Sequence, residues 1–255
     1  MLFRAYFGEK KGFPAAVSTN CAKIVPAAKG RLRGFASGRE GRGMNKIDHN
    51  KIMFEQMQAA PRGAKLLLHS CCGPCSTRCL ETLREYFTVT VVYYNPNITD
   101  AAEYEKRKAE QIRFLRETGW AEFLDCDYDP ACFYAAAKGL EKEPEGGARC
   151  GRCFSLRLSY AARLAAEKGY PYYCSTLSVS PHKNAALLNE LGEKYAAQYG
   201  VIWLHNDFKK QNGYLRSIEL AKEHHLYRQN YCGCEFSLRA GEKGALPAES
   251  CPKQE

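Results

Sequence analysis

The chain has 255 residues, which is enough for one or at most two globular domains. Hydrophobic residues make up 45 % and charged residues 25 % of the chain, as in soluble globular proteins. No run of about eighteen apolar residues occurs, so the sequence excludes an integral membrane protein, and its composition excludes collagenous and wholly disordered chains.

The formal net charge of +9 is concentrated near the N-terminus. Residues 1–43 hold nine of the 37 basic residues but only two of the 28 acidic ones, which leaves the rest of the chain at +2. This nearly neutral remainder gives only weak support for a nucleic-acid partner, and we expect no partner that is DNA.

Residues 1–43 are rich in Gly, Ala, Lys and Arg and show no helix or strand period. They have three interpretations: a transit peptide, a nucleic-acid-binding arm, or an extension upstream of a true start at Met44. We favour the last, because ordered-looking sequence begins at Met44. We therefore expect one domain over 44–238, a tail over 239–255, and a fold and activity that survive deletion of 1–43.

From Met44 onward, short β-rich apolar runs alternate with helical patterns. The runs that we predict as strands are 65–70, 89–95, 121–126, 170–177 and 201–207. The predicted helices are 75–86, 101–118, 153–168, 182–199 and 211–224. Asp100 and Glu103 form a capping box before the second helix, and Gly119 and Gly169 are stop signals.

This alternation predicts an α/β fold, a Rossmann-like three-layer sandwich whose mostly parallel sheet carries helices on both faces. In such sheets the ligand site lies at the carboxyl ends of the strands. We expect the cysteine-bearing loops to lie at these ends.

The chain contains 13 cysteines, which is more than packing requires. The N-terminal sequence lacks the sustained apolar segment of a signal peptide, so a secreted disulfide framework is not indicated, and we expect a cytoplasmic protein. Clustered cysteines in a reducing compartment indicate metal ligands or redox thiols. The clusters are Cys71, Cys72 and Cys75; Cys150 and Cys153; and Cys232 and Cys234.

All three groups are expected on loops or helix starts, where the helix dipole favours thiolates. Four thiolate ligands suit an iron–sulfur cluster or zinc. Two alternatives stay open. Cys72-Gly73-Pro74-Cys75 has the arrangement of a thioredoxin-type dithiol, although the additional cysteine pairs weaken that interpretation. A structural zinc site from the first two groups is also consistent, although their separation is wider than in compact zinc ribbons.

Cys232-Gly233-Cys234 is a different signal. A disulfide between these cysteines would close a very small ring and would be easily reduced, and Gly233 supplies the backbone freedom that closure needs. The sequence favours a redox-active pair, with metal ligation as the alternative.

Residues 44–238 resemble the QueH-type epoxyqueuosine reductases, the cobalamin-independent enzymes that complete queuosine in tRNA. The resemblance covers about 195 of the 255 residues. It is carried by blocks in one order: LLLHSCCGPCS (66–76), YYNPNI (93–98), GLEKEPEGGARCGRCFSLRL (139–158), STLSVSPHKN (175–184), NDFKKQNGYLRSIEL (206–220) and LYRQNYCGCEFS (226–237).

The resemblance implies a [4Fe–4S] cluster and a separate redox-active cysteine pair that together reduce the epoxide of epoxyqueuosine in the tRNA anticodon loop. The implied cluster ligands are Cys71, Cys72, Cys150 and Cys153, and the implied pair is Cys232 and Cys234. It also implies an electron donor of unknown identity and an additional mononuclear iron. On chemical grounds alone, the candidate ligands of that iron are Cys75, Asp127 and Asp207.

Further candidates come from residue type. Basic residues in three segments are candidate phosphate contacts, with a solvated helix face as the alternative: Lys209, Lys210 and Arg216; His182 and Lys183; and Lys106, Arg107 and Lys108. Tyr93, Tyr94 and Tyr231 are candidates for base stacking, with core packing as the alternative. His69, next to the first cysteine group, is a candidate proton donor to the leaving oxygen.

Overall fold

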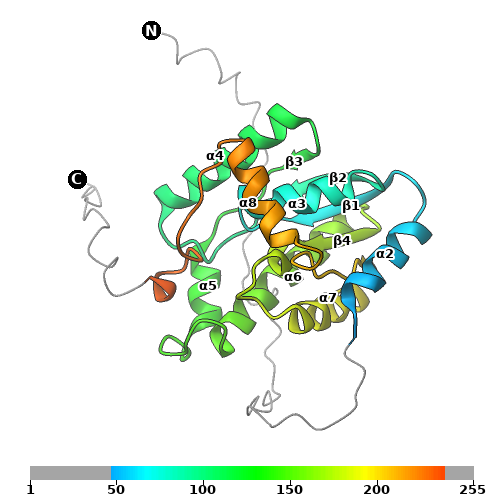
Figure 1. Ribbon diagram of the computed structural model, residues 1–255. Helices are drawn as coiled ribbons and strands as arrows, with labels where there is room; N and C mark the ends of the chain where they lie inside the picture. Colours follow the sequence, from blue (N-terminus) through cyan, green and yellow to red (C-terminus); the bar gives the residue numbers. More distant parts are fainter. Residues whose placement is uncertain (1–46, 239–255) are drawn as a thin grey trace, which may run out of the picture.

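The computed structural model describes residues 47–238. Five strands form one parallel sheet in the order β3-β2-β1-β4-β5 (Figure 1). The strands are β1 (Ala64–His69), β2 (Phe87–Val92), β3 (Glu122–Leu124), β4 (Tyr172–Ser175) and β5 (Ile202–Trp203). Each overlaps one of the predicted strands; β1 has the predicted length, shifted by one residue, and the other four strands are shorter. The predicted N-terminal extension over 1–43 and tail over 239–255 lie outside the described residues.

Helices cover both faces of the sheet, which confirms the predicted Rossmann-like α/β sandwich. Helices α3 (Gly73–Leu83), α4 (Ala101–Thr118) and α8 (Gly213–Glu223) pack on one side. Helices α5 (Pro130–Ala137), α6 (Ala148–Lys168) and α7 (Ala185–Tyr199) pack on the other, where α2 (His49–Ala59) contacts α7. Two short 3-10 turns, η1 (Thr176–Val179) and η2 (Glu235–Ser237), complete the described part.

The sequence signals for helix ends have their expected structures. The Asp100 carboxylate accepts a hydrogen bond from the Glu103 amide at 2.7 Å, and Gly119 and Gly169 end α4 and α6 in the left-handed conformation. The start of α6 differs from the prediction, because this helix begins at Ala148 rather than at 153. Cys150 and Cys153 therefore lie within the first two turns of a helix.

The core lies around the two central strands. Leu66, Leu67 and Leu68 of β1 are fully buried, because helices cover both faces of the sheet and leave no solvent-facing side to alternate with. At the edge, Gly192 of α7 lies against Trp203 of β5, where a Cβ atom would come within 2.2 Å of the indole ring. Among residues 47–238, no helix has the length and apolarity needed to cross a membrane.

Candidate functional site: a cysteine cavity at the switch point of the sheet

The chain leaves β1 toward β2 on one side and returns to β4 on the other, so the strand order reverses between β1 and β4. A crevice forms at the carboxyl ends of two such strands, and ligands of open α/β sheets bind there. Cys71 follows β1 and Thr176 follows β4. The Cys71 amide donates a hydrogen bond to Thr176 Oγ1 at 3.0 Å, which joins the two strand ends.

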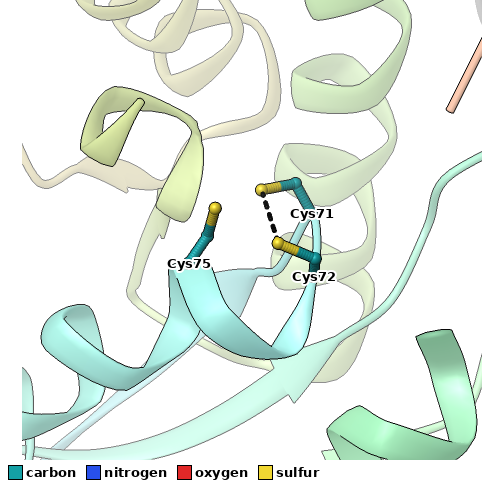
Figure 2. Close-up of side chains that lie close together, drawn as sticks. All are labelled: Cys71, Cys72 and Cys75. Atoms are coloured by element: carbon teal, nitrogen blue, oxygen red, sulfur yellow. Dashed lines mark hydrogen bonds between the residues drawn. The ribbon is translucent and has the colours of Figure 1, made fainter. Parts of the chain in front are cut away.

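Three cysteines gather at the start of α3 (Figure 2). Cys72 is the N-cap residue and has an extended backbone, and Pro74 in the first turn suits the fixed φ of a helix start. The sulfur atoms of Cys71, Cys72 and Cys75 all lie within 4.8 Å of one another, and those of Cys71 and Cys72 are 4.0 Å apart. The three cysteines thus lie at the turn from β1 to α3.

The three sulfurs differ in their affinity for protons. Hydrogen bonds from the Cys72 and Cys75 thiols hold the pKa of Cys71 well below its ordinary value. Because Cys72 donates to the Cys71 sulfur, its own pKa is raised to about 12, and the pKa of Cys75 is raised for the same reason. The group therefore favours one thiolate, on Cys71, supported by two thiols.

These cysteines lie in a cavity of about 340 Å³. The lining comes from the α3 start, the 179–183 segment, α8 and the 228–232 segment. Its charged or polar side chains include Glu145, Arg157, His182, Lys183, Arg228 and Tyr231. Sequence reasoning did not single out Glu145, Arg157 or Arg228, although all three lie in the blocks that carry the resemblance, because residue type alone does not show which charged side chains line a cavity.

Cys150 and Cys153 lie outside the group of three sulfurs. The Gly146 amide donates a hydrogen bond to the Cys150 sulfur at 3.2 Å, and the Arg157 guanidinium lies 4.0 Å from the Cys153 sulfur. Burial raises the pKa of Cys153 to about 12 against the opposing effect of Arg157, and Cys232 contributes to the rise. Cys153 and Cys232 are therefore within electrostatic reach of each other.

The Cys232-Gly233-Cys234 segment is fixed against α4 and the loop before it. Cys232 lines the cavity, and both cysteines are free thiols. Arg107 donates a hydrogen bond to the Cys232 carbonyl at 3.3 Å, and the Thr99 amide donates one to the Gly233 carbonyl at 3.2 Å. Gly233 has φ +111°, and a Cβ atom there would lie 2.8 Å from Ile98. Only glycine fits this turn without strain.

The expectation for His69 is wrong. This residue is fully buried, and its Nδ1 and Nε2 lie 2.8 Å from Ser175 Oγ and 3.0 Å from the Tyr94 carbonyl. Burial, together with the positive charge of Arg157, lowers the pKa of His69 to about 3. The ring is a neutral part of the core below the cysteines and does not line the cavity.

The three tyrosines that are candidates for base stacking differ in burial. Tyr93 and Tyr94 are buried, and the Tyr94 ring stacks on the Tyr160 ring at 3.6 Å, so the core interpretation holds for both. Tyr231 lines the cavity and lies 4.9 Å from the guanidinium of Arg107. It is the one of the three that a base entering the cavity can reach.

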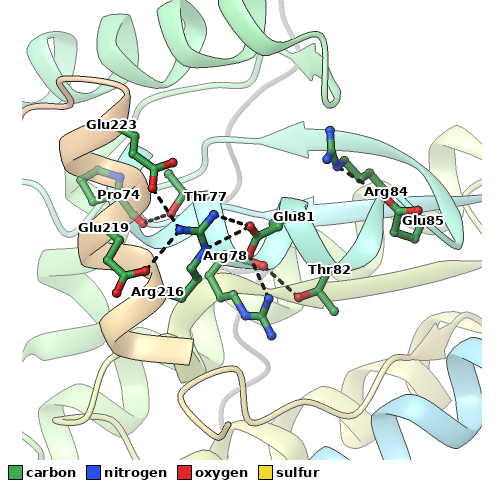
Figure 3. A network of polar contacts seen from close by, with 10 residues as sticks. All are labelled: Pro74, Thr77, Arg78, Glu81, Thr82, Arg84, Glu85, Arg216, Glu219 and Glu223. Carbon is green, nitrogen blue, oxygen red and sulfur yellow. Dashed lines mark hydrogen bonds and ion pairs between the residues drawn. The ribbon is translucent and has the colours of Figure 1, made fainter. Parts of the chain in front are cut away.

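Several of the basic candidates are occupied by acidic partners. Arg216 binds Glu81 of α3 at 2.9 Å and also Glu219 and Glu223 of its own helix, which ties α8 to α3 (Figure 3). Three other cations are paired in the same way: Arg107 with Glu103 at 2.7 Å, Lys108 with Asp125 at 2.6 Å, and Lys209 with Asp207 at 2.7 Å.

Of the candidate ligands for an additional iron, only Cys75 lines the cysteine cavity. Asp127 is exposed, and Asp207 is buried in its ion pair with Lys209. The structure therefore does not bring these two carboxylates to the three sulfurs.

Comparison with known proteins gives one consistent family. Residues 66–240 match the family described as epoxyqueuosine reductase QueH. The chain is 42 % identical to epoxyqueuosine reductase QueH of Staphylococcus epidermidis over 202 residues, which covers 75 % of this chain and 85 % of the relative. It is 39 % identical to the protein of the same name from Streptococcus pyogenes serotype M1, over 76 % of this chain and 79 % of the relative. It is 34 % identical to the protein of the same name from Thermotoga maritima, over 68 % of this chain and 90 % of the relative.

Proposed function

The chain belongs to the epoxyqueuosine reductase QueH family, and we propose that it reduces the epoxide of epoxyqueuosine at the wobble position of tRNA to queuosine. The observation that carries the proposal is the cavity at the β1–β4 switch point, into which Cys71, Cys72, Cys75 and Cys232 all open. A cavity lined by several thiols suits redox chemistry.

We propose that Cys71, Cys72, Cys150 and Cys153 would hold a [4Fe–4S] cluster, since thiolates are the ligands of such clusters. Three observations support this set of ligands. The sulfurs of Cys71 and Cys72 lie close together, and the pKa of Cys71 is lowered, which favours its thiolate. Cys150 and Cys153 are free thiols at the start of α6. Such a cluster transfers electrons one at a time when bound. Cys75 is the ligand that we propose for an additional mononuclear iron, because its sulfur lies within the same group.

The proposed redox-active pair is Cys232 and Cys234. Cleavage of an epoxide to an alkene and water consumes two electrons and two protons. Oxidation of the two thiols to a disulfide supplies both electrons and both protons, and the unidentified electron donor then restores the dithiol. Cys232 is the member of the pair that lines the cavity, so it is the thiol nearer the substrate.

We propose that the modified base leaves the anticodon stack to enter the cavity, since enzymes that act on a base commonly require this. Tyr231 offers an aromatic face at the cavity. His182, Lys183 and Arg228 offer positive or polar groups there, and we propose them as contacts to the RNA backbone. Their positions in the cavity lining distinguish them from Arg216, whose charge is neutralised by three carboxylates.

A Cys232→Ser variant tests the proposed reaction. Under anaerobic conditions with epoxyqueuosine-containing tRNA, we expect this variant to retain its iron and to lose multiple turnover. Cys126→Ser is the matched control, because Cys126 is a partly exposed free thiol that does not line the cavity. Full multiple turnover by the Cys232 variant with its iron intact would remove the pair from the reaction, and an inactive wild-type protein would overturn the proposed function.

A further inference from the structure

Arg157 is a buried cation with an unusual set of partners. It lies on α6 one turn after Cys153, and the residue is 1 % exposed. Its guanidinium donates hydrogen bonds to Asn95 Oδ1 and, at 3.3 Å, to His69 Nε2, and it lies 4.0 Å from the Cys153 sulfur. Among the described residues, no carboxylate forms an ion pair with it.

The other fully buried arginines are compensated differently. Arg107 pairs with the Glu103 carboxylate at 2.7 Å. Arg149 donates to backbone carbonyls of residues 140–143. A buried charge without compensation is strongly destabilising. The partners of Arg157 are a neutral amide, a neutral imidazole and a sulfur, and the Cys153 sulfur is the one among them that can carry a negative charge.

The electrostatics support that assignment. The sulfurs of Cys153, Cys71 and Cys232 all raise the pKa of Arg157 against the opposing effect of burial. Arg157 also lines the cavity that holds the cysteine group. The guanidinium therefore borders both the Cys153 sulfur and the cavity that Cys71, Cys72, Cys75 and Cys232 line.

Building on the function proposed above, we propose that Arg157 is the buried counter-ion of the cysteine site and that its positive charge raises the reduction potential of the iron–sulfur cluster held there. Reduction adds one negative charge to a cluster. A fixed positive charge in a low-dielectric interior stabilises the reduced form more than the oxidised form. Arg157 is in this account a tuning residue, because it acts on electron transfer through the cluster and not on the substrate.

The test is a potentiometric titration of the reconstituted protein, followed by the electron paramagnetic resonance signal of the reduced cluster. We expect Arg157→Gln to shift the one-electron equilibrium toward the oxidised form by at least about tenfold, which is ~59 mV to more negative potential. Arg157→Lys keeps the charge and should stay closer to the wild type. Arg163→Gln is the matched control: Arg163 lies on the same helix, is 36 % exposed and is paired with Glu167, so its loss should leave the potential unchanged.

Asn95→Asp provides a second test if the glutamine variant does not fold. This change is nearly isosteric and places a carboxylate against the guanidinium that Asn95 now contacts. Neutralising Arg157 in this way should also move the potential to more negative values. If Arg157→Gln and Asn95→Asp fold and their clusters have the same reduction potential as that of the wild type, the proposed role of Arg157 is overturned. A wild-type protein that binds no cluster would instead overturn the proposed function on which it rests.

Discussion

Thr176 Oγ1 contacts Cys71 twice, accepting a hydrogen bond from the Cys71 amide at 3.0 Å and donating one to the Cys71 sulfur at 3.2 Å. The two residues follow β1 and β4, the strands between which the order of the sheet reverses. One hydroxyl group therefore fixes both the backbone and the sulfur of the first cysteine in the site.

Replacing Thr176 by Val removes this hydroxyl while keeping the shape of the side chain. The Cys71 amide then has no acceptor in a partly buried position, which should cost about 1–3 kcal/mol in the free energy of unfolding. Thr176→Ser retains the hydroxyl and should remain closer to the wild type. Urea unfolding of the apoprotein measures both; equal stability of the two variants would show that the contact is not needed.

Acid should destabilise the protein through His69. Its pKa is lowered from the ordinary value of 6.5 to about 3 in the folded state. Between these two pH values His69 is protonated in the unfolded chain but not in the folded chain. The free energy of unfolding therefore falls as the pH drops from about 6.5 toward 3. This shift in the pKa of His69 corresponds to a loss of a few kcal/mol in the free energy of unfolding, at about 1.4 kcal/mol per pKa unit.

His69→Gln should flatten this part of the profile of unfolding free energy against pH. The exposed His182 is the control, and its replacement by Gln should leave the profile as in the wild type. A His69 variant with the same acid dependence as the wild type would show that other groups cause it.

Gly233→Ala should disturb the turn that carries Cys232 and Cys234, the proposed redox-active pair. The added Cβ atom would lie 2.8 Å from Ile98 and 3.1 Å from the Arg107 guanidinium, in addition to the strain of φ +111°. We expect a loss of about 1–3 kcal/mol in the free energy of unfolding and slower disulfide formation between Cys232 and Cys234. Gly139→Ala is the control, since its φ is +79° but no atom lies within 4 Å of the added group.

Basic residues at the cavity should contribute to tRNA binding, whereas Arg216 should not. Lys183→Gln removes a charge from the cavity lining, and we expect weaker binding with a salt slope reduced by about one. Arg216→Gln breaks only the links among α3 and α8, at a cost of about 1 kcal/mol or less in stability. Affinities measured at several salt concentrations check this; a larger loss of affinity for Arg216→Gln would reverse the assignment.

Much of the fold could be predicted from the sequence because its signals are local. The apolar run of β1 and the caps of α4 at Asp100 and Gly119 each lie within a few residues and appear where expected. Two helices were missed. α5 has only eight residues, which is too short for a clear period, and α2 has a weak apolar pattern beside the ambiguous N-terminal segment.

The site was predictable only in part, for the same reason. The grouping of Cys71, Cys72 and Cys75 follows from a local strand-to-helix turn. The burial of His69 and the ion pairs of Arg216 depend on residues far away in the chain, such as Ser175 and Glu81. Partners so distant in the chain leave no signal in the spacing of the sequence. The residue type alone therefore did not show that His69 is buried or that Arg216 is paired.

Iron and sulfide analysis of the protein, purified and reconstituted without oxygen, tests the proposed iron–sulfur cluster. We expect about four iron atoms and four sulfide ions per chain, and loss of both when Cys71 is replaced by Ser. An iron count above the sulfide count would support the additional iron at Cys75. Zinc in place of iron, or no bound metal after reconstitution, would contradict the proposed cluster and the reduction that depends on it.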